Sequence, residues 1–213
     1  MKRICMAALM LASITFISAC GSPEEQIHKH LEETIVLEKD FEDQQKPLME
    51  LEQEEKALFD EIMSLGMKHF DKITSLSNEA LANLDKREEH LAKEEEAMEA
   101  SKNEFEKIDD VLDKMEDEKI QAKAKELQDL MNKRFDAHGQ LVSAYKDVIQ
   151  EDRKMYEMLK DKELKHEDLE AQIVKSNEAQ EKVLEANEKF NEYTKTFNAE
   201  KEKLYKEAGI GSE

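Results

Sequence analysis

The sequence predicts an all-α protein that is long and thin. The chain has 39% charged residues, only 6% aromatic residues and no Trp, a composition that is unusual for a compact core. Its five Gly and two Pro residues leave few places to turn. The abundant Glu, Lys, Leu, Ala, Gln and Met are good helix formers, and apolar residues recur at seven-residue spacing. We therefore expect a few very long helices in an elongated bundle.

The first residues have the pattern of an export signal. Lys2 and Arg3 supply a positive start, and the segment 4–16 is uncharged and mostly apolar. That length suits a signal core and is too short to span a bilayer comfortably. We expect residues 1–19 to be a lipoprotein signal peptide outside the fold, and residues 20–213 to form a single elongated helical-bundle domain.

The end of this signal resembles the lipoprotein box of bacteria, in which an aliphatic residue and two small residues precede a lipid-accepting cysteine. Here these residues are Ile17, Ser18, Ala19 and Cys20. One alternative is an incidental cysteine beside an ordinary cleavage site, and another is a disulfide with Cys5, which lies in the segment that would be discarded. Two or three acyl chains anchor a protein stably. We expect a diacylglycerol on Cys20 to hold the chain on the extracytoplasmic face of the cell membrane.

The first helical segment is expected over residues 22–64. Ser22 and Glu25 have the spacing of a capping box, so the helix should begin almost at the lipid. Pro47 is expected to kink this helix. Gly66 suits a left-handed cap and gives the first stop.

The second segment, residues 67–134, is predicted to be the longest, at about 100 Å. Its apolar residues recur every seven positions, at Leu84, Leu91, Met98, Phe105 and Leu112. The run KEEEAME, residues 93–99, is usually a solvated helix face and not a metal site. The companion positions of the apolar track are polar, so the buried seam should be thin here. These polar positions are Arg87, Glu88, Glu94, Glu95, Ser101 and Lys102.

Two shorter segments complete the prediction, residues 137–161 and 166–208. Residues 136–139 give a turn signal that ends in Gly139, and residues 160–170 look like a short break with a new helix near His166. The last segment has the clearest alternation of four and three, at Ala179, Val183, Ala186, Phe190, Tyr193, Phe197 and Leu204.

Three arrangements fit these segments. We favour an elongated antiparallel three-helix bundle whose last helix is broken, because segments 137–161 and 166–208 together match the second segment in length. The alternative is a four-helix up-and-down bundle. One long intermolecular coiled coil is the third, and the turn signals near Gly66 and Gly139 argue against it.

The chain resembles the YkyA-like cell-wall-binding lipoproteins of Gram-positive bacteria. The resemblance rests on the lipobox, the KDKELKHEDL break and the FNEYTKTFNAEKEKLYK ending, and it covers essentially the whole chain. It implies a spectrin-like helical bundle at the cell surface. Only Cys20 carries over as a functional residue.

No pattern of catalytic residues is present in the sequence. HExxH, GxSxG and Gly-rich phosphate loops are absent. His28 and His30 are two residues apart, so on a helix they point about 200° apart and cannot share a metal. His90 is expected on the helix surface. We expect no enzyme activity, no metal site and no cofactor.

The formal net charge of −20 limits the partners. Loss of Lys2 and Arg3 with the signal would make it −22, so nucleic acid is excluded. Contact with anionic wall polymer would need bridging cations, a local neutral patch or a protein intermediary, and we expect weak wall binding or none. We expect a lipid-anchored rod that contacts wall polymer or an envelope protein. The alternatives are a chaperone or assembly partner for exported proteins and, third, a solute-binding lipoprotein, which we expect to lack an apolar pocket of a few hundred Å³.

Overall fold

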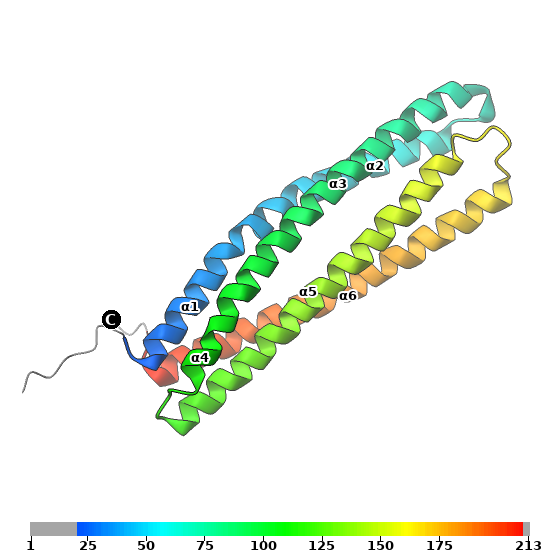
Figure 1. Ribbon diagram of the computed structural model, residues 1–213. Coiled ribbons are helices and arrows are strands. Elements are labelled where there is room, and N and C mark those ends of the chain that lie inside the picture. Colours follow the sequence, from blue (N-terminus) through cyan, green and yellow to red (C-terminus); the bar gives the residue numbers. More distant parts are fainter. Residues whose placement is uncertain (1–20, 211–213) are drawn as a thin grey trace, which may run out of the picture.

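The computed structural model describes residues 21–210, and every element in that range is helical (Figure 1). The all-α class is therefore confirmed for the described residues. The signal segment and the lipobox residues Ile17 to Cys20 lie outside the described part of the chain. The long helices are α1 (Pro23–Leu37), α2 (Lys39–Ser64), α3 (Phe70–Phe105), α5 (Glu118–Met158) and α6 (His166–Ala208).

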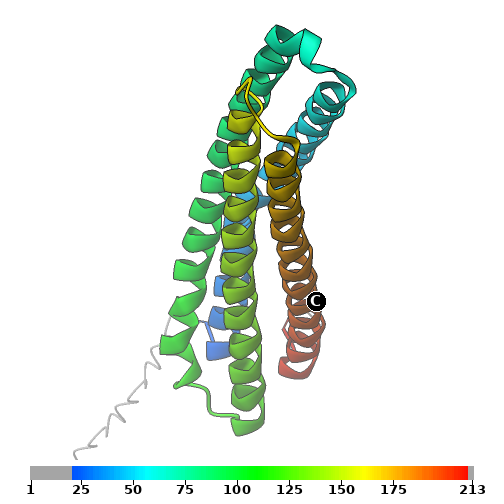
Figure 2. The same ribbon diagram turned by 90° about the vertical axis from the view of Figure 1, so that its right-hand side faces the viewer.

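The long helices lie side by side as a rod, in which successive segments run in opposite directions (Figures 1 and 2). We call one end the base, which holds Gly21, the turn 113–117 and Ala208. We call the other end the tip, where the turns 65–69 and 159–165 lie together. At 1.5 Å per residue, the 43-residue helix α6 is about 65 Å long. The rod is thus shorter than the predicted helix of about 100 Å.

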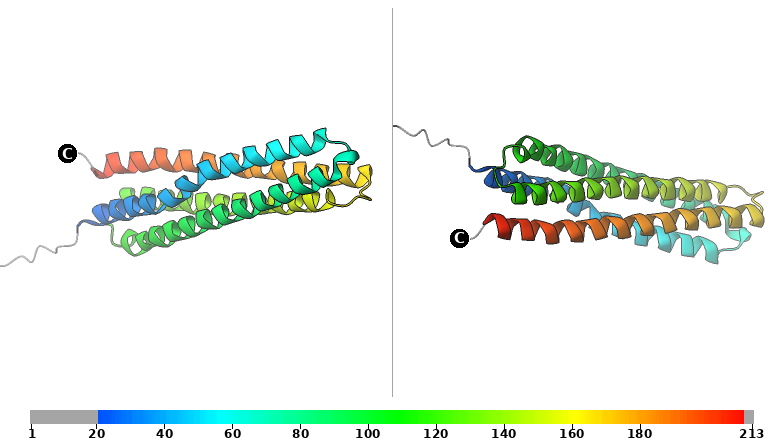
Figure 3. Two further views of the ribbon diagram at one scale, coloured as in Figure 1. Left: turned by 90° about the horizontal axis from the view of Figure 1, so that it is seen from above. Right: turned by 90° about the horizontal axis from the view of Figure 1, so that it is seen from below.

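The first segment begins as the sequence predicts. The Ser22 hydroxyl accepts from the Glu25 amide at 3.2 Å, and the Ser22 amide donates to the Glu25 carboxylate at 3.0 Å. These two bonds confirm the capping box. The structure interrupts the segment at Glu38, between α1 and α2, where it bends (Figure 3). Pro47 lies inside α2.

The predicted boundary between the second and third segments is wrong. Residues 136–139 lie in the middle of α5, because an interior Gly costs a helix only about 1 kcal/mol and packing can outweigh it. The chain turns earlier, after α3, through the short helices η2 (Glu106–Ile108) and α4 (Asp109–Leu112). Asp117 then caps α5, and its carboxylate accepts from the amides of Lys119 at 2.9 Å and Ile120 at 3.1 Å.

The pairing of the last two segments also differs from the prediction. Helix α6 begins at His166 and ends at Ala208, as predicted. It folds back along α5 instead of continuing the preceding segment end to end (Figure 1). The described residues therefore hold four long segments, α1–α2, α3, α5 and α6. The short helix η1 (Met67–His69) makes the turn between the first two.

The apolar core divides into two main clusters along the rod. The cluster toward the base is rich in aromatic rings, among them Phe105, Phe135, Phe190 and Phe197. The cluster toward the tip is built mainly from aliphatic residues around the fully buried Tyr156. Of the apolar positions predicted on the last helix, all are buried except Tyr193, which is half-buried.

Candidate functional site

The predicted lipobox, Ile17 to Cys20, precedes the described part of the chain. Helix α1, which follows closely, begins at the base of the rod (Figure 1). The helix α1 starts at Pro23, so only a short segment separates it from Cys20. Among the described helices, none has the length and apolar character needed to cross a membrane.

Three of the polar positions on α3 form a row that faces the first segment. These residues are Arg87, Glu94 and Ser101, which are buried and spaced seven apart. Each bonds to a side chain of the first segment, in the order Glu55, Gln45 and Glu38. The expectation of a solvated face, made for residues 93–99, is wrong for Glu94, because its partner comes from a neighbouring helix. We call these pairs the polar row.

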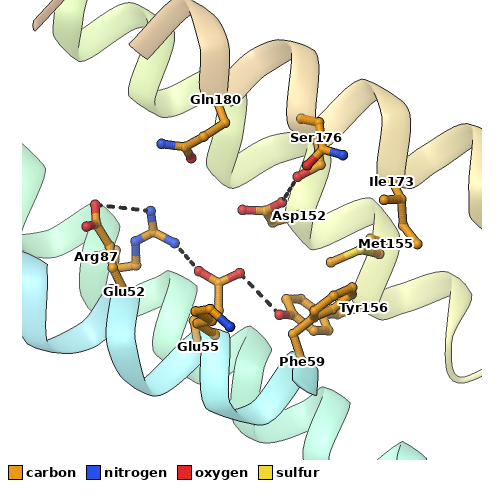
Figure 4. A pocket seen from close by; sticks show the side chains of 12 residues that line it. Glu52, Glu55, Phe59, Arg87, Asp152, Met155, Tyr156, Ile173, Ser176 and Gln180 are labelled. Atoms are coloured by element: carbon orange, nitrogen blue, oxygen red, sulfur yellow. Dashed lines mark hydrogen bonds and ion pairs between the residues drawn. The ribbon is translucent and has the colours of Figure 1, made fainter. Parts of the chain in front are cut away.

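The polar row ends beside a cleft of about 300 Å³ between α2, α3, α5 and α6 (Figure 4). The cleft is lined largely by polar groups, whereas the expectation from the sequence concerned an apolar pocket. Its labelled residues are Glu52, Glu55 and Phe59 from α2, Arg87 from α3, Asp152, Met155 and Tyr156 from α5, and Ile173, Ser176 and Gln180 from α6.

Arg87 is a buried cation of this cleft, and it is only 3% exposed. Its guanidinium forms an ion pair with Glu55 and lies 3.8 Å from the carboxylate of Glu52. Its Nε donates to the Tyr145 hydroxyl at 3.2 Å, and the guanidinium carbon lies 4.9 Å from the centre of that ring. Removal of one of these partners would leave the buried charge of Arg87 uncompensated, which is costly.

Two carboxyl groups of the cleft have raised pKa values. Burial raises the pKa of Glu55 to about 7, although Arg87 opposes the shift. The Tyr156 hydroxyl donates to Glu55 at 3.2 Å. Burial also raises the pKa of Asp152, against the hydrogen bond from Ser176. Each of these carboxyls is held by other side chains, so the cleft is a titratable cluster that joins α2 and α3 to α5 and α6.

A second buried ion pair lies where α1 meets α2. Both terminal nitrogens of Arg134 donate to the Glu38 carboxylate, at 2.6 and 2.8 Å. Its Nε donates to the Thr194 hydroxyl at 2.9 Å, and its guanidinium carbon lies 4.9 Å from the centre of the Phe190 ring. A bidentate pair of this kind is geometrically specific. It fixes the bend at Glu38 against α5 and α6.

The histidines occupy four kinds of surroundings. His28 and His30 point apart, as predicted, because His28 lies edge-on to Tyr205 and His30 bonds to Glu104 at 2.8 Å. His90 is half-buried and bonds to Gln44 at 2.7 Å. His166 is exposed in the first turn of α6 and pairs with Glu170 at 3.1 Å. His138 is the fourth kind and lies in the core.

His138 is buried between the rings of Phe41 and Phe190. Its Nε2 atom has no hydrogen-bond partner among the described residues. Burial, together with the nearby charge of Arg134, lowers its pKa to about 4. The residue belongs to α5 and takes no part in a turn.

The tip carries an apolar hollow of about 250 Å³ between its two turns. Apolar side chains from α2, α3 and the turn 159–165 line it, and so do Lys165 and His166. Met63 also lines it and is 47% exposed. The tip thus presents apolar surface at the end of the rod that lies farthest from Gly21.

The chain is similar in sequence and in fold to known proteins. The family model described as "YkyA: Putative cell-wall binding lipoprotein" matches residues 22–207. A Bacillus subtilis (strain 168) protein named "Uncharacterized lipoprotein YkyA" is 39% identical over 187 residues, which cover 88% of this chain and 84% of that protein. A 1.6 Å crystal structure of a conserved Staphylococcus aureus protein of unknown function matches with a TM-score of 0.76 at 18% identity. That match covers 85% of this chain and 93% of the other, and at this identity it shows the fold alone.

Proposed function

Because the chain belongs to the YkyA family of lipoproteins, we propose that it is a lipid-anchored, non-catalytic helical rod that makes contacts within the cell envelope. The observation that carries the proposal is the separation of its two ends. The residue that follows the predicted lipid attachment site lies at the base, and the exposed apolar hollow lies at the tip.

The anchor is assigned to a diacylglycerol on Cys20, within the lipobox formed with Ile17, Ser18 and Ala19. Helix α1 starts at Pro23 with its own capping box, so the lipid is followed by a rigid element and not by a long flexible tether. A diacylated cysteine remains on the membrane. The rod then extends the tip by about 65 Å from its attachment point.

The partner that fits the tip is another envelope protein that offers an apolar side chain. The formal charge of −20 repels anionic wall polymers at low salt, whereas an apolar hollow binds without charge complementarity. Wall polymer is the second class of partner that the rod could contact directly in the same role. The family description supports a place at the wall for either form.

An assembly or chaperone role is the alternative function. It is favoured by an exposed apolar group beside the bend between α1 and α2, formed by Ile35, Val36 and Leu37. Val36 is 71% exposed there. A solute-binding role is less favoured, because Arg87, Glu55 and Asp152 in the cleft already have hydrogen-bond partners.

We further assign the bundle to the four-helix up-and-down class instead of the three-helix class. Support comes from α6, which packs along α5, and from the short turns that join successive segments. The base cluster, to which α1, α3, α5 and α6 all contribute, favours the same assignment.

Fractionation of cells that express Cys20→Ala tests the anchor. We expect the wild-type protein to carry labelled fatty acid and to sediment with membranes, and the variant to lose the label. Unlabelled wild-type protein would overturn the proposed localisation. Sedimentation of the mature chain with purified sacculi, with and without teichoic acid, separates the two partner classes. Tight capture that depends on Mg²⁺ and on teichoic acid would favour wall polymer over a protein partner.

A further inference from the structure

We propose that His30, Glu33 and Glu104 form a binding site for a first-row transition dication such as Zn²⁺, which links α1 to α3 near the base. Nothing in the proposed envelope role requires this site, so the inference stands independently of that role. One ligand atom from each residue lies within 4.8 Å of the others. Of the described residues, no other group of His, Cys, Asp and Glu side chains comes together in this way.

The donor set comes from two helices. His30 and Glu33 are three residues apart on α1 and therefore share a face, with 3.8 Å between Nδ1 and Oε2. Glu104 comes from the last turn of α3, and its Oε1 lies 2.8 Å from the same imidazole nitrogen. One imidazole with two carboxylates suits Zn²⁺ and its neighbours in the first transition row, whereas Ca²⁺ and Mg²⁺ prefer all-oxygen sites.

To take an ion, the side chains must rotate, and the His30 imidazole must carry its proton on Nε2 so that Nδ1 can ligate. Zn²⁺ holds nitrogen and oxygen ligands at about 2.0–2.2 Å in a tetrahedral arrangement, which places the ligand atoms roughly 3.3 Å apart. The observed separations of 2.8 and 3.8 Å lie on either side of that value. Glu33 is half exposed and free to rotate, whereas Glu104 is held in place, with a side chain only 11% exposed. Three protein ligands would leave the fourth position for water.

Two lysines already balance the negative charge of this group. Lys107 pairs with Glu104, and Lys29 lies 3.6 Å from the second oxygen of Glu33. The hydrogen bond from Lys107 lowers the pKa of Glu104 to about 2, so this carboxylate is ionised and ready to ligate. Lys107 is 58% exposed on a flexible side chain, so a dication competes with it. Removal of this lysine should strengthen metal binding.

The test is metal titration of the complete mature chain, without an affinity tag and with Cys20→Ser so that the thiol cannot bind metal. Isothermal titration with Zn²⁺ gives the affinity, and the visible absorption of Co²⁺ reports its ligands. We expect one equivalent to bind, at least tenfold weaker binding in His30→Gln and Glu104→Gln, and severalfold tighter binding in Lys107→Met. His28→Gln is the matched control, because His28 lies on the same helix with Glu32 at 3.9 Å but without a third ligand.

A melting experiment guards against misfolded variants. Bound metal stabilises the native state in proportion to the logarithm of its concentration above Kd, so Zn²⁺ should raise the melting temperature of wild type and of His28→Gln, but not of His30→Gln. Circular dichroism before titration confirms that each variant is helical. The proposal is overturned if the wild-type chain binds no Zn²⁺ at millimolar concentration. It is equally overturned if His30→Gln binds as tightly as wild type, or if Lys107→Met binds more weakly.

Discussion

At the scale of single residues, the buried ion pairs determine how the helices meet inside the rod. Arg87 lies among two glutamates and a tyrosine, and Arg134 bridges Glu38 and Thr194. Ion pairs of this kind cost much to break but little to replace as a whole. Their value lies in specifying which helices meet, and at which register.

Arg87→Met should destabilise the bundle strongly, because it leaves Glu55 buried without its cation. The expected loss in unfolding free energy is about 3–5 kcal/mol, measured by urea denaturation. The double variant Arg87→Met with Glu55→Gln should recover much of this loss, since it removes both charges. Equal stability of the single and double variants would show that the ion pair does not carry the effect.

The stability of the bundle should depend on pH through Glu55 and Glu94. Burial raises the pKa of both groups from an ordinary value near 4.5 to about 7. The native state therefore binds protons at a higher pH than the unfolded state, and this contribution to stability is lost as the pH rises through 7. Between pH 8 and pH 6 the unfolding free energy should increase by about 1 kcal/mol for each carboxyl.

Glu55→Gln with Glu94→Gln is the variant that checks this pH dependence. Its stability should be nearly flat from pH 8 to pH 6, because neither carboxyl remains to titrate. A wild-type chain that loses stability over this range, or a double variant with the same slope, would contradict the assignment.

The titration of His138 should have the opposite effect on the unfolding free energy, and at lower pH. Burial lowers its pKa from 6.5 to about 4, so the unfolded state takes up the proton first. Its contribution to stability is complete above pH 6.5 and is lost as the pH falls toward 4. His138→Leu should remove this loss, measured as thermal melting at pH 5 relative to pH 7. An unchanged difference between the two pH values would count against the buried neutral imidazole.

At the scale of elements, the sequence predicted the outer boundaries better than the inner one. The capping box at Ser22 and the start of α6 at His166 have local signals, and both were predicted. The turn 113–117 holds no Gly or Pro and depends on the Asp117 cap, so it was missed. Gly139 indicated a turn that does not exist, because packing along α5 outweighs the helix propensity of one glycine.

The candidate sites were predictable to a smaller extent. The lipid attachment at Cys20 is carried by contiguous residues, which a single sequence displays. The polar row was missed, because its partners come from another helix and Glu94 lies in a run that is typical of a solvated face. The spacing of His30 and Glu33 is present in the sequence, but Glu104 joins them only after α1 and α3 pack together.

Pro47→Ala should stabilise α2. A proline inside a helix removes one backbone hydrogen bond and costs up to about 3 kcal/mol relative to alanine. Because the bend of this segment lies at Glu38, the bundle should not need Pro47 for its shape. We expect a gain of about 1 kcal/mol or more in unfolding free energy, measured by urea denaturation with unchanged helix content. A loss of stability would indicate that the bundle requires a local distortion at Pro47.

At the scale of the whole molecule, the account depends on a rod with two different ends. A compact chain of this size would have a radius of gyration of about 17 Å. Helices about 65 Å long, laid side by side, should instead give at least roughly 20 Å. Small-angle scattering of the mature chain measures this value, and a result near the compact value would contradict the elongated bundle in solution.

The most direct test of the central claim is site-specific photocrosslinking in intact cells. A photoreactive residue is placed at Met63 on the tip or, as a matched exposed control, at Val174 on α6. We expect the probe at Met63 to capture a discrete envelope component, and that capture to be lost when Cys20→Ala removes the anchor. The probe at Val174 should capture little. Equal capture from both positions, or capture at Met63 that persists without the anchor, would contradict a lipid-anchored rod that makes its contacts from the tip.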